Sequence, residues 1–229
     1  MGGVMLRILL RGFLLACSLA GTTSTADAAD QISGPFPAVQ QTTLATKWQD
    51  AKQRMAADEA RLSQCRAEAV SCSVDMLRFD TIVAAARERQ GRARIGEINR
   101  AVNLAIRPVA DERQYGVMDH WSGPLETIYA GAGDCEDYAI LKLLALQQAG
   151  IARQDLRLLI VKDNRLRRDH AVAAVRLDGR WLVLDNRGFA LVDLALTHYR
   201  ILAQLDPNEQ VQFAAFEGPV AETSSRDVM

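Results

Sequence analysis

The fold of this chain is decided by residues 169–186, which read DHAVAAVRLDGRWLVLDN. Two apolar runs flank the dipeptide Asp178-Gly179. An Asp-Gly pair between such runs is a strong signal for a two-residue β-hairpin turn. The turn predicts an antiparallel hairpin in which Leu177 pairs with Arg180.

The register of this hairpin brings a histidine close to a carboxylate. Counting outward from the turn, Val172 faces Asp185, and His170 lies two residues before Val172 on the same face of the sheet. Diagonal neighbours are about 7–8 Å apart, within reach of longer side chains. An aspartate placed in this way can orient an imidazole for acid–base catalysis. Taken singly, a hydrogen-bonded sheet histidine and a turn-forming aspartate explain the two residues equally well.

Residues 131–137, which read GAGDCED, place Cys135 at the start of a helix that we expect to run to Ala149. The positive end of a helix dipole stabilises a thiolate. Backbone N–H groups at the same helix start could form an oxyanion hole. We expect the two glycines to let the backbone approach a substrate closely.

The alternative interpretation of this motif is structural, with a small apolar residue at a helix start that Asp134 and Asp137 cap. The combination of a helix-start cysteine with a His–Asp hairpin favours the catalytic interpretation. The predicted catalytic residues are Cys135, His170 and Asp185.

Apolar periodicity elsewhere predicts helices first and strands afterwards. After an extended arm at 30–43, the expected helices cover 42–66, 74–89, 93–106, 124–131 and 135–149. The expected strands cover 156–161, 170–177, 180–184, 199–205 and 210–216. This order predicts an α+β fold, with N-terminal helices followed by an antiparallel sheet in one domain over residues 29–216 and a loose tail at 217–229.

The first 28 residues have the features of a signal peptide. Arg7 and Arg11 precede an apolar stretch at 13–20, and Ala26-Asp27-Ala28 fits the cleavage pattern. The apolar stretch is too short to span a membrane. We therefore expect export to the periplasm. Cys17 also fits a lipobox, so a lipoprotein anchor is the alternative.

Without residues 1–28 the chain has a net charge of −2, which argues against nucleic acid as a partner. Three cysteines remain after export. In an oxidising compartment an odd number suggests one disulfide and one thiol kept for chemistry. We expect Cys65 and Cys72 to form the disulfide and Cys135 to stay free. Two buried free thiols are the alternative.

Three carboxylates, those of Asp134, Glu136 and Asp137, lie within one turn of Cys135. Uncompensated negative charge there would raise the pKa of the thiol. A calcium ion bound by these oxygens would neutralise them and order the loop. Helix capping and solvated charge are the alternative explanation. His120 and His198 have no partner at metal spacing, so zinc is not expected.

Three motifs together resemble the bacterial transglutaminase-like cysteine proteinases, and among them the LapG-type periplasmic proteases that release adhesins. The resemblance covers roughly residues 40–205, and Trp121, Pro124 and Leu125 also fit it. The motifs are residues 133–139, 169–172 and 184–186.

This resemblance implies a papain-like α+β core in which Cys135 is the nucleophile, His170 the general base and acid, and Asp185 the orienting carboxylate. It also implies calcium dependence, with ligands among Asp134, Glu136 and Asp137. The implied substrate is the N-terminal region of a large surface adhesin, cut at a paired-alanine site, which would control biofilm attachment. The implied partner is an inner-membrane cyclic-di-GMP receptor that sequesters the protease. The rival classes are another acyl-transfer enzyme, such as a transglutaminase or an amidase, and a binding module without turnover.

Overall fold

The computed structural model describes residues 38–68, 70, 72–208 and 211–213. The predicted signal peptide and the tail predicted from Glu217 lie outside these residues. Among the described residues, no helix combines the length and the apolar character needed to cross a bilayer.

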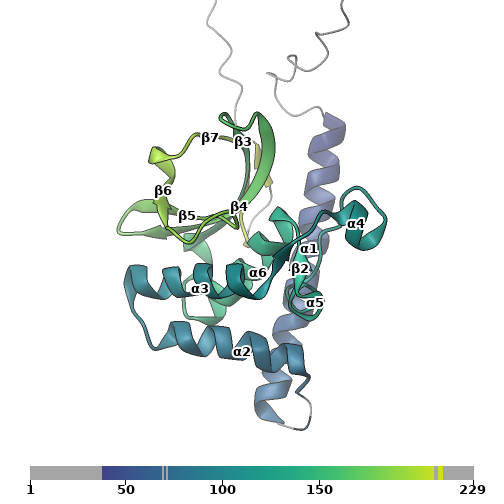
Figure 1. Cartoon of the computed structure of the whole chain (residues 1–229), viewed down its shortest axis with the longest axis vertical. Helices are drawn as coiled ribbons and strands as arrows, with labels where there is room; N and C mark the ends of the chain where they lie inside the picture. Colours follow the sequence, from purple (N-terminus) through teal and green to yellow (C-terminus); the bar gives the residue numbers. More distant parts are fainter. Residues whose placement is uncertain (1–37, 69, 71, 209–210, 214–229) are drawn as a thin grey trace, which may run out of the picture. The chain divides into compact units, whose positions relative to one another are not determined.

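The expected helices are present, with ends that differ by a few residues from the predicted ones. In chain order the helices are α1 (Ala38–Ala67), α2 (Val74–Arg87), α3 (Gly91–Ala105), a short α4 (Asp111–Tyr115), α5 (Pro124–Ala130) and α6 (Cys135–Gln148) (Figure 1). The prediction of an extended arm as far as residue 43 was wrong, because α1 begins at Ala38. Prolines such as Pro35 and Pro37 are tolerated where a helix begins, so they do not mark where it must be absent.

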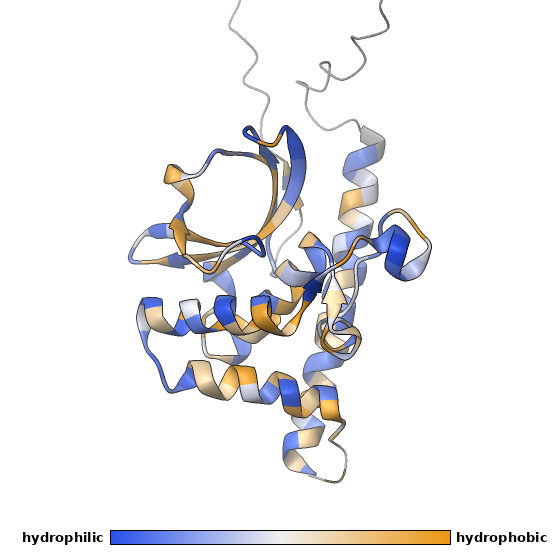
Figure 2. Ribbon diagram, viewed as in Figure 1, coloured by the Kyte–Doolittle hydropathy of each residue, from blue (hydrophilic) through white to orange (hydrophobic). Residues whose placement is uncertain are grey.

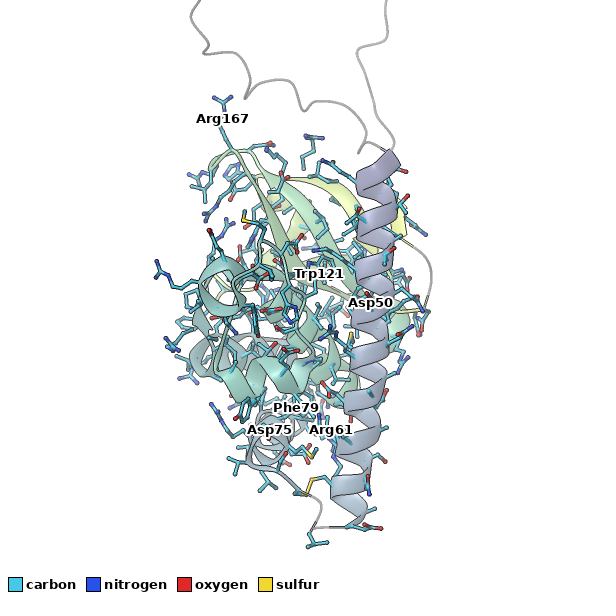
Figure 3. All side chains as sticks on the ribbon, turned by 90° about the vertical axis from the view of Figure 1, so that its right-hand side faces the viewer. Asp50, Arg61, Asp75, Phe79, Trp121 and Arg167 are labelled. Carbon is cyan, nitrogen blue, oxygen red and sulfur yellow. A yellow bond between two sulfur atoms is a disulfide. The ribbon has the colours of Figure 1, made fainter. Side chains whose placement is uncertain are left out.

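The link between α1 and α2 is closed by the predicted disulfide. Cys65 and Cys72 are bonded, and this bond is visible near the lower end of α1 in Figure 3. Cys135 is the free cysteine of the described residues. The prediction that Cys65 and Cys72 form the disulfide and that Cys135 stays free is therefore confirmed.

The sheet has the strand order β6-β5-β4-β3-β7-β8, and all its pairings are antiparallel. The strands are β3 (Leu156–Asp163), β4 (Arg168–Leu177), β5 (Arg180–Leu184), β6 (Val192–Asp193), β7 (Tyr199–Leu205) and β8 (Val211–Phe213). The helices precede this sheet along the chain, so the α+β prediction is confirmed.

The hairpin of β4 and β5 has the predicted register. Leu177 pairs with Arg180, and both turn residues have positive φ, 51° at Asp178 and 77° at Gly179. A type I′ turn requires positive φ at both central positions, which Asp-Gly adopts readily. The pairing that the Asp-Gly turn predicted is therefore confirmed.

Each face of the sheet contributes to a different cluster of buried side chains. Alternate residues of β4, such as Ala171, Ala173 and Val175, pack with α6 and the other helices in the main core. The intervening residues, such as Val172 and Ala174, join a smaller cluster inside the curl of the sheet that Figure 1 shows. The start of α6 lies against the first cluster, since the partly buried Cys135 packs against it.

A two-stranded parallel pairing that was not predicted holds the segment before α6. β1 (Arg107–Pro108) pairs with β2 (Ala132–Gly133), and the N–H of Val109 donates to the carbonyl of Gly133 at 2.9 Å. Strands of two residues leave no periodicity to detect. This pairing places the chain that enters α4 beside the chain that enters α6.

Candidate active site

Cys135 is the first residue of α6, and Asp134 is the N-cap. The thiol donates a hydrogen bond to Oε2 of Glu136 at 3.0 Å. Burial and the negative charge of Glu136 raise the pKa of Cys135 well above its ordinary value, while the backbone N–H of Ala171 lowers it. Ala171 directly follows His170, so the thiol lies beside β4 one residue from the histidine.

His170 and Asp185 form the predicted pair. Nε2 of His170 lies 3.0 Å from Oδ1 of Asp185, and the histidine is only 5% exposed. Burial alone would raise the pKa of Asp185, but hydrogen bonds from His170 and Tyr199 hold it below its ordinary value. Because the ionised carboxylate faces Nε2, Nδ1 is the ring nitrogen left to exchange a proton with a nucleophile.

Side chains that the sequence analysis did not single out hold Asp185 in place. The hydroxyl of Tyr199 donates to Oδ2 of Asp185. The amide of Asn103 donates to the main-chain carbonyl of Asp185 at 2.8 Å. The backbone N–H of Arg187 donates to Oδ1 at 3.0 Å. The carboxylate is thus fixed from β7 and from its own loop, and the main chain of Asp185 is fixed from α3.

Lys142 supports the same strand end from inside the core. It is fully buried, and its ammonium donates to the carbonyl of Leu184 at 3.2 Å. Burial lowers the pKa of Lys142 to about 7, and the charge of Asp185 opposes that shift. The sequence did contain a signal for this residue, because Lys142 is the one charged position between Tyr138 and Leu146.

The predicted calcium ligands lie in two overlapping groups of carboxylates. Asp111, Asp134 and Asp137 offer oxygen atoms within 4.8 Å of one another, and so do Asp111, Asp119 and Glu136. The three acids predicted from the sequence are all included. Asp111 and Asp119 were missed, because they come from the α4 region more than ten residues upstream of α6.

These groups fit a hard cation. Oδ1 of Asp111 and Oδ1 of Asp134 are buried and have no hydrogen-bond partner among the described residues. Burial and the charge of Glu136 raise the pKa of Asp134, and burial raises that of Asp137 to about 7. Buried polar atoms normally have partners, and calcium takes six to eight oxygen ligands. A calcium ion would therefore supply the missing partner and the missing positive charge.

Helix capping, the alternative explanation for these acids, also holds for Asp137. Its carboxylate accepts the N–H of Ser122 at 2.8 Å and the N–H of Asp134 at 3.3 Å. The capping interaction and a place in the cation site are compatible, because each carboxylate oxygen has two lone pairs.

Each of the two glycines before Cys135 has a role within the protein itself, and the expected approach of a substrate to this backbone stays a prediction. Gly131 ends α5 with φ of 58°, a conformation that glycine adopts without strain. A Cβ on Gly133 would lie 2.7 Å from Oδ2 of Asp137. Gly133 therefore makes room for a buried carboxylate of the protein itself.

Among the described residues, Cys135 is expected to be the only thiol that iodoacetamide modifies in the folded protein, because Cys65 and Cys72 are bonded to each other. Mass spectrometry of the intact protein and of its tryptic peptides would check this. One added carbamidomethyl group on Cys135 is the expected result. Modification of Cys65 or Cys72 without a reductant would contradict it.

Comparison with known proteins identifies the family. A family model described as bacterial transglutaminase-like cysteine proteinase matches residues 53–219. No curated protein gives a match. Legionella pneumophila LapG superposes with a TM-score of 0.55 at 19% identity, over 68% of this chain and 87% of that chain. Calcium-bound LapG from the same organism gives 0.56 at 21% identity, over 67% and 87%.

At these identities, the solved structures establish a shared fold. The family model goes further, because it spans most of the chain and the positions of Cys135, His170 and Asp185. This chain therefore belongs to the bacterial transglutaminase-like cysteine proteinases.

Proposed function

We propose that this protein is a calcium-dependent cysteine endopeptidase of the periplasm that cuts the N-terminal region of a large surface adhesin. Cleavage would release the adhesin and so control biofilm attachment. The observation that carries the proposal is the hydrogen bond between His170 and Asp185. The free thiol of Cys135 at the start of α6 contacts the backbone of Ala171, the residue after His170.

The mechanism follows from the roles of these three side chains. His170 takes the proton of the Cys135 thiol at Nδ1, and the sulfur attacks the scissile carbonyl. Backbone N–H groups at the start of α6 stabilise the oxyanion. The imidazolium then gives its proton to the leaving amine, which departs and leaves a thioester on Cys135. His170 next removes a proton from water, which attacks the thioester and frees the acid and the thiol. Asp185 orients the ring and stabilises its charged form throughout.

Calcium, when bound, supplies positive charge that offsets the carboxylates around the thiol. Asp111, Asp134 and Asp137 would hold it, with Asp119 and Glu136 as further oxygen donors. The existence of a calcium-bound LapG structure supports this assignment.

The substrate, the partner and the location rest on the family and on the sequence. The signal-peptide pattern of residues 1–28 supports export. Similarity to LapG supports the adhesin as substrate and an inner-membrane cyclic-di-GMP receptor as the partner that sequesters the protease. A transglutaminase or an amidase would use the same triad. A transglutaminase would differ from a protease in the acceptor, which is an amine in place of water, and an amidase would differ in the amide that is attacked.

The test is incubation of residues 29–229 with N-terminal adhesin fragments from the same bacterium, with calcium or with a chelator. We expect one defined cut at a paired-alanine site in calcium and none in the chelator, read by mass spectrometry of both products. A parallel reaction with a glutamine peptide and an amine would detect amide transfer. Amide transfer without cleavage, or no reaction with any fragment in calcium, would contradict the proposal.

A further inference from the structure

The connection between β3 and β4 is rich in arginine. Residues 164–168 read NRLRR, and the whole connection is exposed. The end of β3 and β4 at this connection is largely hydrophilic in Figure 2. Figure 3 shows the side chain of Arg167 pointing away from the rest of the domain. Arg200, on the neighbouring strand β7, is exposed at the same end of the sheet.

The carboxylates at this end of the sheet are already engaged. Asp163 pairs with Arg187 at 2.7 Å, and Asp169 pairs with Lys162 at 3.2 Å. Within the described ranges, no carboxylate pairs with Arg165, Arg168 or Arg200, and these three residues are called the arginine patch below.

One member of the patch lies beside a further cation. Arg200 is directly opposite Lys162 in the ladder between β3 and β7, and Asp169 already pairs with Lys162. The chain as a whole has a net charge of −1, so the excess of positive charge is local. Several arginines elsewhere are paired, among them Arg66 with Asp80 and Arg176 with Asp155.

The patch adjoins the catalytic residues. Arg168 precedes His170 by two positions in β4 and so lies on the same face of the sheet. Arg165 lines a cavity of about 470 Å³ whose wall also includes Asp185 and Tyr199. An extended peptide covers about 3.3 Å per residue. Substrate side chains a few residues from the scissile bond can therefore reach the patch.

We propose that the arginine patch binds acidic side chains of the substrate on one side of the scissile bond. The proposal rests on the proposed endopeptidase function and adds the chemical class of the sequence that it prefers. Guanidinium groups suit this task, because they bind carboxylates in a bidentate manner and stay charged at any physiological pH.

The test uses internally quenched peptides with a central Ala-Ala pair and four variable positions on one side or the other. These positions hold Asp and Glu in one set and the isosteric Asn and Gln in the matched set. Exposed charge pairs contribute about 0.2–1 kcal/mol each, so we expect kcat/KM to be about three- to ten-fold higher for the acidic set on one side, mainly through KM. Calcium is kept saturating throughout.

Two changes should remove this preference. Raising sodium chloride from about 0.01 M to about 1 M shortens the Debye length from about 30 Å to about 3 Å and should bring the ratio close to one. The triple variant R165Q/R168Q/R200Q should do the same while still cutting the neutral peptides. Arg180→Gln is the control, because Arg180 is exposed at the opposite end of β4 and β5 and has no ion pair with the described residues. It should keep the full preference.

A binding measurement distinguishes failure of this proposal from failure of the proposed protease function. The Cys135→Ser variant is titrated into fluorescent acidic and neutral peptides, and anisotropy is read. Tighter binding of the acidic peptide, lost in the triple variant, supports the patch even if nothing is cut. Equal rates and equal binding for the two sets overturn the proposal. The proposal is also overturned if the arginine patch is needed for binding to phosphatidylglycerol vesicles while the protein shows no preference for acidic peptides. The patch would then be a lipid-binding surface.

Discussion

Cys135→Ala is expected to give a folded protein that cuts no substrate. Removing the nucleophile of a catalytic triad lowers kcat by about 10⁶-fold. The remaining activity would be below the detection limit of most cleavage assays. Circular dichroism and thermal unfolding should match the wild type, because the residue is small and only partly buried. Cleavage at the wild-type site by this variant would refute the assignment of Cys135.

Asp185→Asn is expected to lower kcat by about 10⁴-fold with little change in KM, because an amide cannot stabilise the imidazolium and favours the wrong tautomer of the histidine. Tyr199→Phe removes only the hydroxyl that donates to Oδ2 of Asp185. A hydrogen bond to a charged group contributes about 1.5–3 kcal/mol, so we expect a kcat loss of about 10- to 100-fold.

The control for Tyr199→Phe is Tyr129→Phe. Tyr129 is 80% exposed on α5, and its replacement should change neither constant. An Asp185→Asn enzyme with wild-type kcat would show that the pair with His170 is structural only.

Asp111→Asn together with Asp134→Asn is expected to abolish calcium binding and calcium-dependent cleavage. Even outer residues around a metal cost about 10- to 100-fold in affinity when they are changed, so the loss of two charged ligands should exceed that. Asparagine keeps an oxygen that can accept the N–H of His120, which Asp111 accepts now. The fold should therefore survive.

Calorimetric titration of calcium into chelator-treated protein checks this prediction. Magnesium should substitute poorly, since it demands octahedral geometry and gives up water reluctantly. Asp50→Asn, an exposed acid on α1, is the control and should bind like the wild type. If the heat of calcium binding is unchanged in the single variant Asp111→Asn, Asp111 is not a calcium ligand. Absence of heat in the wild type would contradict the calcium site altogether.

The parts of the structure that depend on neighbours in sequence were predictable. The Asp178-Gly179 turn predicted the register of β4 and β5, and this register places His170 near Asp185. The motif of residues 131–137, with Asp134 at the N-cap position, predicted that Cys135 begins a helix. The separation of Cys65 from Cys72 was short enough for the disulfide to be a local event.

The contacts that depend on distant segments were not predictable. Asp111 reaches Asp134 because β1 pairs with β2, and two-residue strands leave no trace in composition or period. Tyr199 and Asn103 reach Asp185 from a later strand and an earlier helix, and no turn rule relates these segments to the hairpin.

The sequence by itself determined the α+β order, the hairpin register and the choice of Cys135, His170 and Asp185 as the candidate catalytic residues, because turns and helix starts are governed by the residues within them. Only the tertiary structure decided which carboxylates gather at the start of α6 and which side chains hold Asp185. Those contacts depend on how whole helices and strands pack, and the packing is set by burial of the shared core rather than by any local pattern.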